Sequence, residues 1–418
     1  MIKIDHSTLT KDPKLGHYEI GGKIFWDKPS ALIEGSKLNL KIEDLKWNFN
    51  EDTFSKFDWS NEPPGDIRDY YKLRAKQIRE KYDYIILNLS GGGDSTTVLY
   101  SFIQAGLFVD EVMVRHATVA TKNFKSDRRN FNPSNEFSEF EFAAMPLLKW
   151  LSTVSPQTKI TVHDFSKDVL DDTIVWDENF IYWTGDYVTP GCIVRYNNAT
   201  NLETLRTFDK GKNVAIIFGT DKPKFFIHQG NCYFYFVDRV VHSAVPSAVN
   251  NGFTNTNVEL FYWSPDLPAL IAKQCHIIKR WFELPENQRL SYMLDFWWQT
   301  SSANRTAYEW VIKSIIYPDY DLSTFQCDKP VKSVYQEWDF WLENFKDSPG
   351  YKTFMRGKDF LYKNINESFL RIASSDRMPD AKINPDNWEY KICISKKYLI
   401  GKFDKKENLI LVDKGPSF

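Results

Sequence analysis

The segment YDYIILNLSGGGDSTTVLY, residues 82–100, joins an apolar run to three consecutive glycines and then to an Asp-Ser-Thr step. A continuous apolar run is typical of a parallel strand that is covered on both faces. Glycines permit positive φ and let backbone N–H groups approach a ligand, and the N-terminus of a following helix adds unpaired donors and partial positive charge. The segment therefore predicts a strand, an anion-binding loop and a helix.

The same alternation of strand and helix extends along the chain on both sides of this segment. Asp66 is a plausible N-cap for a helix over 67–82, directly before the first strand. Further strands are expected at 110–117, 159–165 and 213–219, and further helices at 96–106, 141–154 and 199–208. Such alternation predicts an α/β fold with a doubly wound, mainly parallel sheet and right-handed crossovers.

Regions with different patterns flank this alternation, so we expect three domains. Residues 1–65 contain short strand-like runs and form an N-terminal β-rich appendage, and residues 66–258 form the α/β domain and end near a hairpin. Residues 259–418 form a mostly helical region that ends in a β-hairpin. The hairpin of the second region is expected at 223–238, the helices of the third at 267–284, 333–345 and 351–365, and its hairpin at 391–415.

Composition limits the classes of protein that the chain can belong to. No apolar stretch approaches the roughly 18 residues of a membrane span, and residues 1–14 lack the apolar part of a signal peptide. The five cysteines form no C-x-x-C pair, which argues against a zinc knuckle or a disulfide framework. The net charge of −2 argues against a surface for long nucleic acid, although a local basic patch stays open. We expect a cytoplasmic protein without a membrane partner that binds small ligands.

Three common motifs fail at the glycine loop. No Lys follows the glycines, so the P-loop pattern G-x-x-x-x-G-K-[ST] is absent. Thr96 occupies the last glycine position of G-x-G-x-x-G, and Asn88 occupies the first glycine position of the hydrolase elbow G-x-S-x-G. The loop is therefore not explained by a P-loop kinase, a dinucleotide-binding enzyme or a serine hydrolase.

The loop resembles the PP-loop of the N-type ATP pyrophosphatases, whose signature S-G-G-x-D-S follows the first strand of this kind of sheet. Ser90, Gly91, Gly92, Asp94 and Ser95 match it, and the resemblance covers roughly residues 80–230. It implies an α/β sheet of the HUP type, cleavage of ATP between its α and β phosphates, adenylation of a substrate oxygen, and displacement of AMP by a nitrogen or sulfur nucleophile. A glycine-rich turn capped by Asp94, without any ligand, is the alternative.

The resemblance also implies roles for single residues of the loop. The backbone of Gly91, Gly92 and Gly93 and the hydroxyls of Ser90 and Ser95, with Thr96 adjoining them, would bind the pyrophosphate group of ATP. A carboxylate repels phosphate unless a cation lies between them, so Asp94 implies Mg²⁺ as a second cofactor beside ATP. Asp94 is accordingly the expected metal ligand.

Two further loops leave strands on the same side of the expected sheet. Gly219, Asp221 and Lys222 follow the strand at 213–219 and resemble the second loop that many PP-loop enzymes place near pyrophosphate or substrate, although a tight structural turn explains them equally well. Asp94, Ser95 and Lys222 are therefore the catalytic candidates. The strand at 110–117 ends at Val114 to His116, where related enzymes bind adenine mainly through the backbone.

Other segments are weaker candidates for the substrate site. The polar connection 121–137 is basic and is either a lid over an anionic substrate or a solvated loop. Residues 185–198 carry Arg195 and Cys192, the one thiol whose surroundings favour a lowered pKa. The aromatic run 295–310 is interpreted as a helix face in the core, and His228, His242 and His276 are interpreted as structural.

The motifs that the chain lacks indicate to which branch of the ATP pyrophosphatase superfamily it is most similar. The chain lacks the E-C-G-[IL]-H segment of sulfate-activating reductases, paired cysteines and a four-cysteine zinc site, and Ile2 stands where a glutaminase carries its nucleophilic cysteine. A sheet followed by a large helical region is most similar to the asparagine-synthetase-like, amide-forming branch. We expect an ATP-dependent ligase that transfers an adenylated carboxyl or carbonyl group of a small molecule or nucleobase to ammonia or an amine. Thiolation of a nucleoside and non-catalytic nucleotide binding stay open, as does assembly into a homo-oligomer.

Overall fold

The structure is a computed structural model of the chain. It describes residues 12–116, 118, 139–164, 176–185, 188–193, 212–242, 256–295, 302–321, 342–372 and 382–404. Its centre is a sheet of five parallel strands in the order β10-β7-β4-β5-β6. These strands are β4 (Tyr84–Asn88), β5 (Glu111–Arg115), β6 (Lys159–His163), β7 (Val214–Phe218) and β10 (Thr256–Leu260). The prediction of an α/β fold built on a parallel sheet is confirmed.

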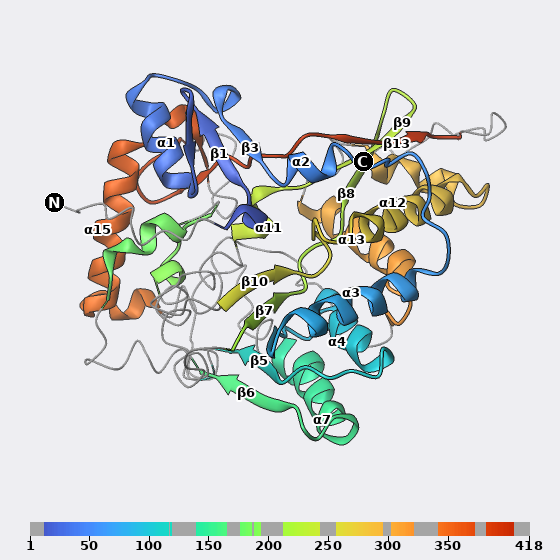
Figure 1. Cartoon of the computed structure of the whole chain (residues 1–418). Coiled ribbons are helices and arrows are strands. Elements are labelled where there is room, and N and C mark those ends of the chain that lie inside the picture. Colours follow the sequence, from blue (N-terminus) through green and yellow to red (C-terminus); the bar gives the residue numbers. More distant parts are fainter. Residues whose placement is uncertain are drawn as a thin grey trace, which may run out of the picture.

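Three helices lie along one face of this sheet (Figure 1), namely α3 (Ile67–Lys81), α4 (Gly93–Gln104) and α7 (Met145–Val154). On that face, Ile85 and Leu87 of β4 belong to the main apolar core. Ile86, Met113 and Ile216 point to the opposite face and form a second, smaller cluster there. Because both faces of the strands are apolar, the strands read as continuous apolar runs. The doubly wound arrangement, with helices on both faces, stays a prediction.

The strand order reverses beside the first strand of the sheet. β4 lies at the centre, β5 and β6 follow it on one side, and β7 and β10 lie on the other. In open parallel sheets, ligands bind outside the carboxyl ends of the strands where the order reverses in this way. The loops that leave β4 and β7 meet at this place.

Most of the expected elements of the α/β region are present where the structure describes the chain. The expected hairpin is formed by β8 (Lys224–His228) and β9 (Asn231–Tyr235), with Gln229 and Gly230 at positive φ in the turn. The helix expected at 199–208 lies outside the described residues. β10 was not anticipated, because its sequence TNVEL is half polar, and it spans the position 258/259 at which a domain boundary is expected.

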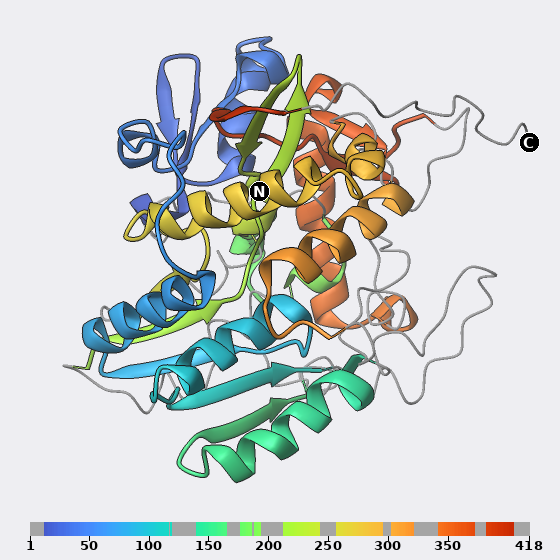
Figure 2. The ribbon, with the colours of Figure 1, turned by 90° about the vertical axis from the view of Figure 1, so that its right-hand side faces the viewer.

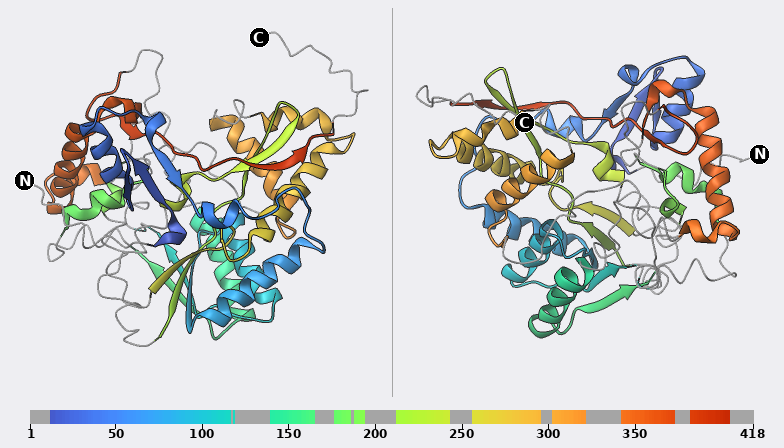
Figure 3. Two further views of the ribbon diagram at one scale, coloured as in Figure 1. Left: turned by 45° about the horizontal axis from the view of Figure 1, so that its top comes forward. Right: turned by 180° about the vertical axis from the view of Figure 1, so that it is seen from behind.

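The N-terminal region contains the expected short strands and also an unexpected helix. β1 (His17–Ile20), β2 (Lys23–Phe25) and β3 (Lys46–Asn48) form an antiparallel sheet in the order β2-β1-β3. The helix α1 (Lys28–Lys37) begins after Asp27, whose carboxylate accepts a hydrogen bond from the backbone N–H of Ser30 at 2.8 Å. Figure 3 shows α1 beside α15 (Pro349–Asn364), which comes from the other end of the chain.

The C-terminal region is largely helical, as expected. α12 (Pro268–Glu283) and α15 confirm the helices predicted at 267–284 and 351–365, and α13 (Ser302–Ile316) lies beside the N-terminal end of α4 (Figure 2). The helix expected at 333–345 lies mostly outside the described residues. β11 (Leu370–Ile372) pairs with β12 (Trp388–Tyr390), and β13 (Tyr398–Lys402) pairs with β9. The second arm of the hairpin expected at 391–415 lies outside the described residues.

Candidate functional site

The glycine loop and the loop after β7 are in direct contact. A Cβ atom on Gly219 would lie 2.8 Å from Cα of Ser95, so only glycine lets the two backbones approach this closely. The Nζ atom of Lys222 lies 3.7 Å from Oδ1 of Asp94. The structure thus brings together the two loops that the sequence singled out.

The hydroxyl groups of the glycine loop hold the loop in shape. Oγ of Ser90 accepts a hydrogen bond from the backbone N–H of Gly92 at 3.3 Å and lies 3.3 Å from Oγ of Ser95. Oγ of Ser95 donates to the carbonyl oxygen of Gly92 at 3.2 Å, and Oγ1 of Thr96 donates to that of Gly91 at 3.3 Å. The expected phosphate-binding hydroxyls of Ser90 and Ser95 are therefore ordered by the loop itself.

The three glycines of the loop differ in what surrounds them. A Cβ atom on Gly91 would lie 2.6 Å from the backbone nitrogen of Ala144, and Gly91 has φ +83°. A Cβ atom on Gly93 would lie 2.8 Å from the ring of Tyr320. On Gly92 the nearest atom would be Oγ of Ser90 at 3.4 Å. Gly91 and Gly93 are thus required by packing, and Gly92 is the glycine at which a ligand has room.

The first turn of α4 supplies backbone donors at this place. Gly92 is the N-cap, so the N–H groups of Gly93, Asp94 and Ser95 belong to the first turn and have no acceptor within the helix. α4 has 12 residues, and its aligned peptide dipoles give this end partial positive charge. The geometry suits an anion.

The carboxylate of Asp94 contacts both a hydroxyl and an ammonium group. Its Oδ1 accepts a hydrogen bond from the hydroxyl of Tyr317 at 2.6 Å, and its Oδ2 lies 3.2 Å from Nζ of Lys313. Burial raises the pKa of Asp94, but the positive charges of Lys222 and Lys313 outweigh this, so the pKa lies below its usual value of 3.8. The carboxylate is ionised at neutral pH.

Lys222 lies in the middle of a cluster of alternating charges. Its Nζ is 2.8 Å from Oδ1 of Asp221 and 3.6 Å from Oε2 of Glu309. Lys224 lies 2.6 Å from Asp221 and 3.8 Å from Glu309. Burial raises the pKa of Asp221, but Lys222 and Lys224 together hold it well below its usual value. A ligand phosphate would have to share these lysines with the carboxylates.

Sequence reasoning missed the residues that α13 contributes. Glu309 and Lys313 lie four residues apart on α13, Tyr317 follows after four more, and all three face the two loops. The spacing of four is visible in YEWVIKSIIY, but the pattern of the segment 295–310 indicated core. Lys313 is buried, with 2% of its side chain exposed, so its pairing with Asp94 compensates for the loss of water.

The expected adenine-binding positions lie at the end of β5, the next strand of the sheet. Val114 and His116 are buried. The backbone N–H of His116 donates to the carbonyl oxygen of His163 at 3.0 Å, and its ring stacks on Phe140 with centroids 4.2 Å apart. Both positions lie at the carboxyl end of β5, the strand that neighbours β4 in the sheet.

Several weaker candidates receive little support or lie outside the described residues. The segment 121–137 and Arg195 are outside them. Cys232, Cys275 and Cys393 are buried, as expected, and burial raises the pKa of Cys232 and of Cys393 to about 12. His276 is buried, and its Nε2 lies 3.0 Å from the carbonyl oxygen of Trp59; the structural role expected of it stays a prediction.

The donor atoms of the site suit Mg²⁺ only in combination with a ligand. Among the described residues, no group of three or more His, Cys, Asp or Glu side chains is placed to hold a metal ion. Mg²⁺ commonly uses one or two carboxylates together with substrate phosphates and water. Asp94 is the acidic residue of the first turn of α4, and 25% of its side chain is exposed. The site therefore fits a cation that arrives with a phosphate ligand.

Comparison with known proteins does not assign the chain to a family. Models of known protein families gave no match, and a search of curated proteins gave no relative. In the part of the chain that the structure describes, no helix is long and apolar enough to cross a membrane. The functional proposal therefore depends on the geometry of the site.

Proposed function

We propose that the chain is an ATP-dependent ligase of the PP-loop ATP pyrophosphatase type, which cleaves ATP to AMP and pyrophosphate. The observation that carries the proposal is the position of Asp94. It lies in the first turn of α4, between Lys222 and Lys313, where the strand order of the parallel sheet reverses. A carboxylate and two buried lysines at a helix N-terminus suit a phosphate ligand that arrives with a cation.

The polyphosphate would lie against the first turn of α4. The N–H groups of Gly93 to Ser95 have no acceptor within the helix and would donate to it, and Gly92 would leave it room. Lys222 and Lys313 each have 2% of the side chain exposed, and charges interact more strongly in such a site than in water. These groups would stabilise the negative charge that develops on the leaving pyrophosphate.

Asp94 would hold Mg²⁺, which supplies further neutralisation of the phosphate charge when bound. The residues of this chain would position the reacting groups in line. In the first step an oxygen of the acceptor attacks the α-phosphorus, the bond to the bridging oxygen breaks, and pyrophosphate leaves with the electron pair. In the second step nitrogen attacks the activated carbon, AMP leaves, and the nitrogen loses a proton. The acceptor is a carboxyl or carbonyl group of a small molecule or nucleobase.

The described thiols favour nitrogen over sulfur as the nucleophile. Sulfur transfer depends on a thiolate, and burial raises the pKa of Cys232, Cys275 and Cys393. Cys192 is half-buried, and its Sγ lies 4.0 Å from Oγ1 of Thr189. An amide-forming enzyme should retain its turnover in a Cys192→Ser variant, and a thiolating enzyme that uses Cys192 should not.

The test is pyrophosphate release from ATP and Mg²⁺ with a pool of metabolites as acceptors. Asp94→Asn should lower the rate by ~10²-fold, the scale of removing one positioned electrostatic group. Asp319→Asn is the matched control, because Asp319 follows α13 and accepts a hydrogen bond from Gln104 at 2.9 Å, away from the two lysines. Normal turnover in Asp94→Asn would remove Asp94 from the mechanism. Nucleotide binding without any pyrophosphate release would favour the non-catalytic alternative.

A further inference from the structure

Three buried tyrosines from distant parts of the chain meet behind Asp94. Tyr71 comes from α3, Tyr262 follows β10, and Tyr317 follows α13. The rings of Tyr262 and Tyr317 stack with centroids 5.5 Å apart, and Tyr71 meets Tyr262 edge to face at 5.9 Å. The cluster joins three elements to the N-terminal end of α4.

The three hydroxyl groups have different acceptors. Tyr71 donates to the carbonyl oxygen of Ile316 at 2.9 Å, and Tyr262 donates to the carbonyl oxygen of Asp94 at 2.7 Å. Tyr317 alone of the three donates to the carboxylate of Asp94, at 2.6 Å. Tyr262 therefore fixes the backbone of Asp94, and Tyr317 fixes its side chain.

The backbone next to Tyr262 is held by a hydrogen bond from a side chain of α3. Arg74 donates from Nε to the carbonyl oxygen of Phe261 at 3.2 Å and pairs with Glu259 at 2.6 Å, so the end of β10 is held against α3. Because both the ring stack and this anchor are buried, the hydroxyl of Tyr317 has little freedom to follow a carboxylate that moves.

We propose that Tyr317 is a positioning residue that keeps the Asp94 carboxylate from closing onto Lys222. Oδ1 of Asp94 lies 2.6 Å from the Tyr317 hydroxyl and 3.7 Å from Nζ of Lys222. Without the hydroxyl, Oδ1 would satisfy its charge by moving to the ammonium group. Lys222, which already pairs with Asp221 and Glu309, would then be neutralised by a third carboxylate and would attract phosphate less, and the Asp94 carboxylate would be turned away from a cation. This inference rests on the proposed function, since it concerns how the same site receives a metal–nucleotide complex.

The experiment compares Tyr317→Phe with Tyr71→Phe. Both variants remove one buried hydroxyl of the same ring cluster, so both should lose stability in urea unfolding, but only Tyr317→Phe removes a donor from the carboxylate. Binding of the non-hydrolysable α,β-methylene analogue of ATP with Mg²⁺ is measured by calorimetry. We expect Tyr317→Phe to weaken binding by about tenfold, the scale of one hydrogen bond to a charged group, and Tyr71→Phe to change it by less than about threefold.

A crystal structure of Tyr317→Phe provides a readout that does not depend on binding. The Asp94 carboxylate should be rotated toward Lys222, with the backbone of residues 90–95 unchanged. Equal affinities in the two variants, or an unmoved carboxylate, would overturn the positioning role while leaving the proposed function intact. Failure of the unmodified protein to bind the analogue at all would overturn the proposed function, and this inference with it.

Discussion

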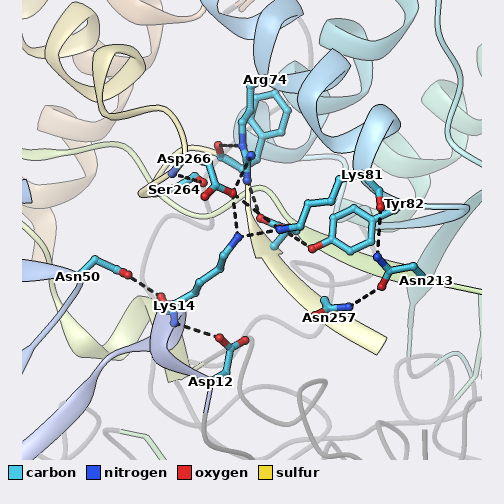
Figure 4. Close-up of polar contacts among 12 residues, drawn as sticks. Asp12, Lys14, Asn50, Arg74, Lys81, Tyr82, Asn213, Asn257, Ser264 and Asp266 are labelled. Carbon is cyan, nitrogen blue, oxygen red and sulfur yellow. Dashed lines mark hydrogen bonds and ion pairs between the residues drawn. The ribbon is translucent and has the colours of Figure 1, made fainter. Parts of the chain in front are cut away.

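The segment 259–262 contacts two clusters of buried charge, one through Glu259 and the other through Tyr262, and the two clusters are built differently. In the first, here called the Glu259 cluster, the carboxylate of Glu259 is 1% exposed and pairs with Arg74, Lys14 and Lys81 at 2.6, 3.2 and 2.9 Å (Figure 4). The hydroxyl of Tyr82 also donates to it. The carboxylate is enclosed, and its partners come from α3 and the N-terminal segment.

In the second cluster, around Asp94, the lysines are enclosed and the carboxylates are the more accessible groups. Lys222 and Lys313 are 2% exposed, whereas Asp94 is 25% exposed. A buried cation beside an accessible carboxylate leaves one side of each ion pair open to a ligand, and an enclosed carboxylate does not. The Glu259 cluster therefore joins secondary-structure elements, whereas the Asp94 cluster is suited to binding a ligand.

Breaking the Glu259 cluster should have the largest effect, and the effect should be on stability. Arg74 is 1% exposed, and removing one partner of a buried ion pair typically costs about 3–5 kcal/mol because the other charge stays buried. Arg74→Met should lower the free energy of unfolding in urea by this amount. Lys81→Met is the control, because Lys81 pairs with the same carboxylate but is 44% exposed, and should cost about 0–1 kcal/mol. Equal losses in both variants would contradict the enclosed geometry.

Acid should weaken the same cluster by a somewhat smaller amount. Burial raises the pKa of Glu259, but Arg74 and Lys14 outweigh it and lower the pKa from 4.5 to about 2. A lowered pKa in the folded state stabilises the fold above pH 4.5, and this contribution is lost as the pH falls toward about 2. It corresponds to about 3 kcal/mol. The unfolding free energy of the unmodified protein should therefore approach that of Glu259→Gln as the pH falls, and a constant difference between them would contradict the prediction.

The sequence predicted one side of the candidate site and missed the other. The loops at 90–95 and 219–222 could be found because glycines and carboxylates follow apolar runs, and parallel strands place their carboxyl ends at one edge. Lys313 and Tyr317 could not be found in this way, because a helical sequence indicates which residues share a face but not which distant loop that face contacts. The tertiary packing of α13 against α4 decides that.

The Glu259 cluster was hidden for a related reason. Glu259 lies in TNVEL, where polar residues mask an edge strand of the sheet whose last three residues are buried. Its cations come from residues 14, 74 and 81, and nothing in the sequence around them indicates a shared carboxylate. Local patterns predicted the strands that are apolar throughout, and failed where long-range charge pairing replaces apolar burial.

The smallest expected effect is on the affinity for ATP, and it distinguishes two lysines of the Asp94 cluster that lie in the same loop. Both lysines pair with Asp221 and Glu309, but of the two it is Lys222 that also lies 3.7 Å from Asp94. If the first turn of α4 binds phosphate, Lys222→Met should weaken the affinity for ATP with Mg²⁺ by about 10- to 100-fold, the range for a hydrogen bond between charged groups. Lys224→Met should weaken it by less than about threefold, because Lys224 is directed to the two other carboxylates.

Calorimetry on both variants, after circular dichroism has shown that they are folded, measures the difference. Equal affinities would mean that the loop after β7 serves only to neutralise Asp221 and Glu309, and the Asp94 cluster would then be structural in the same sense as the Glu259 cluster.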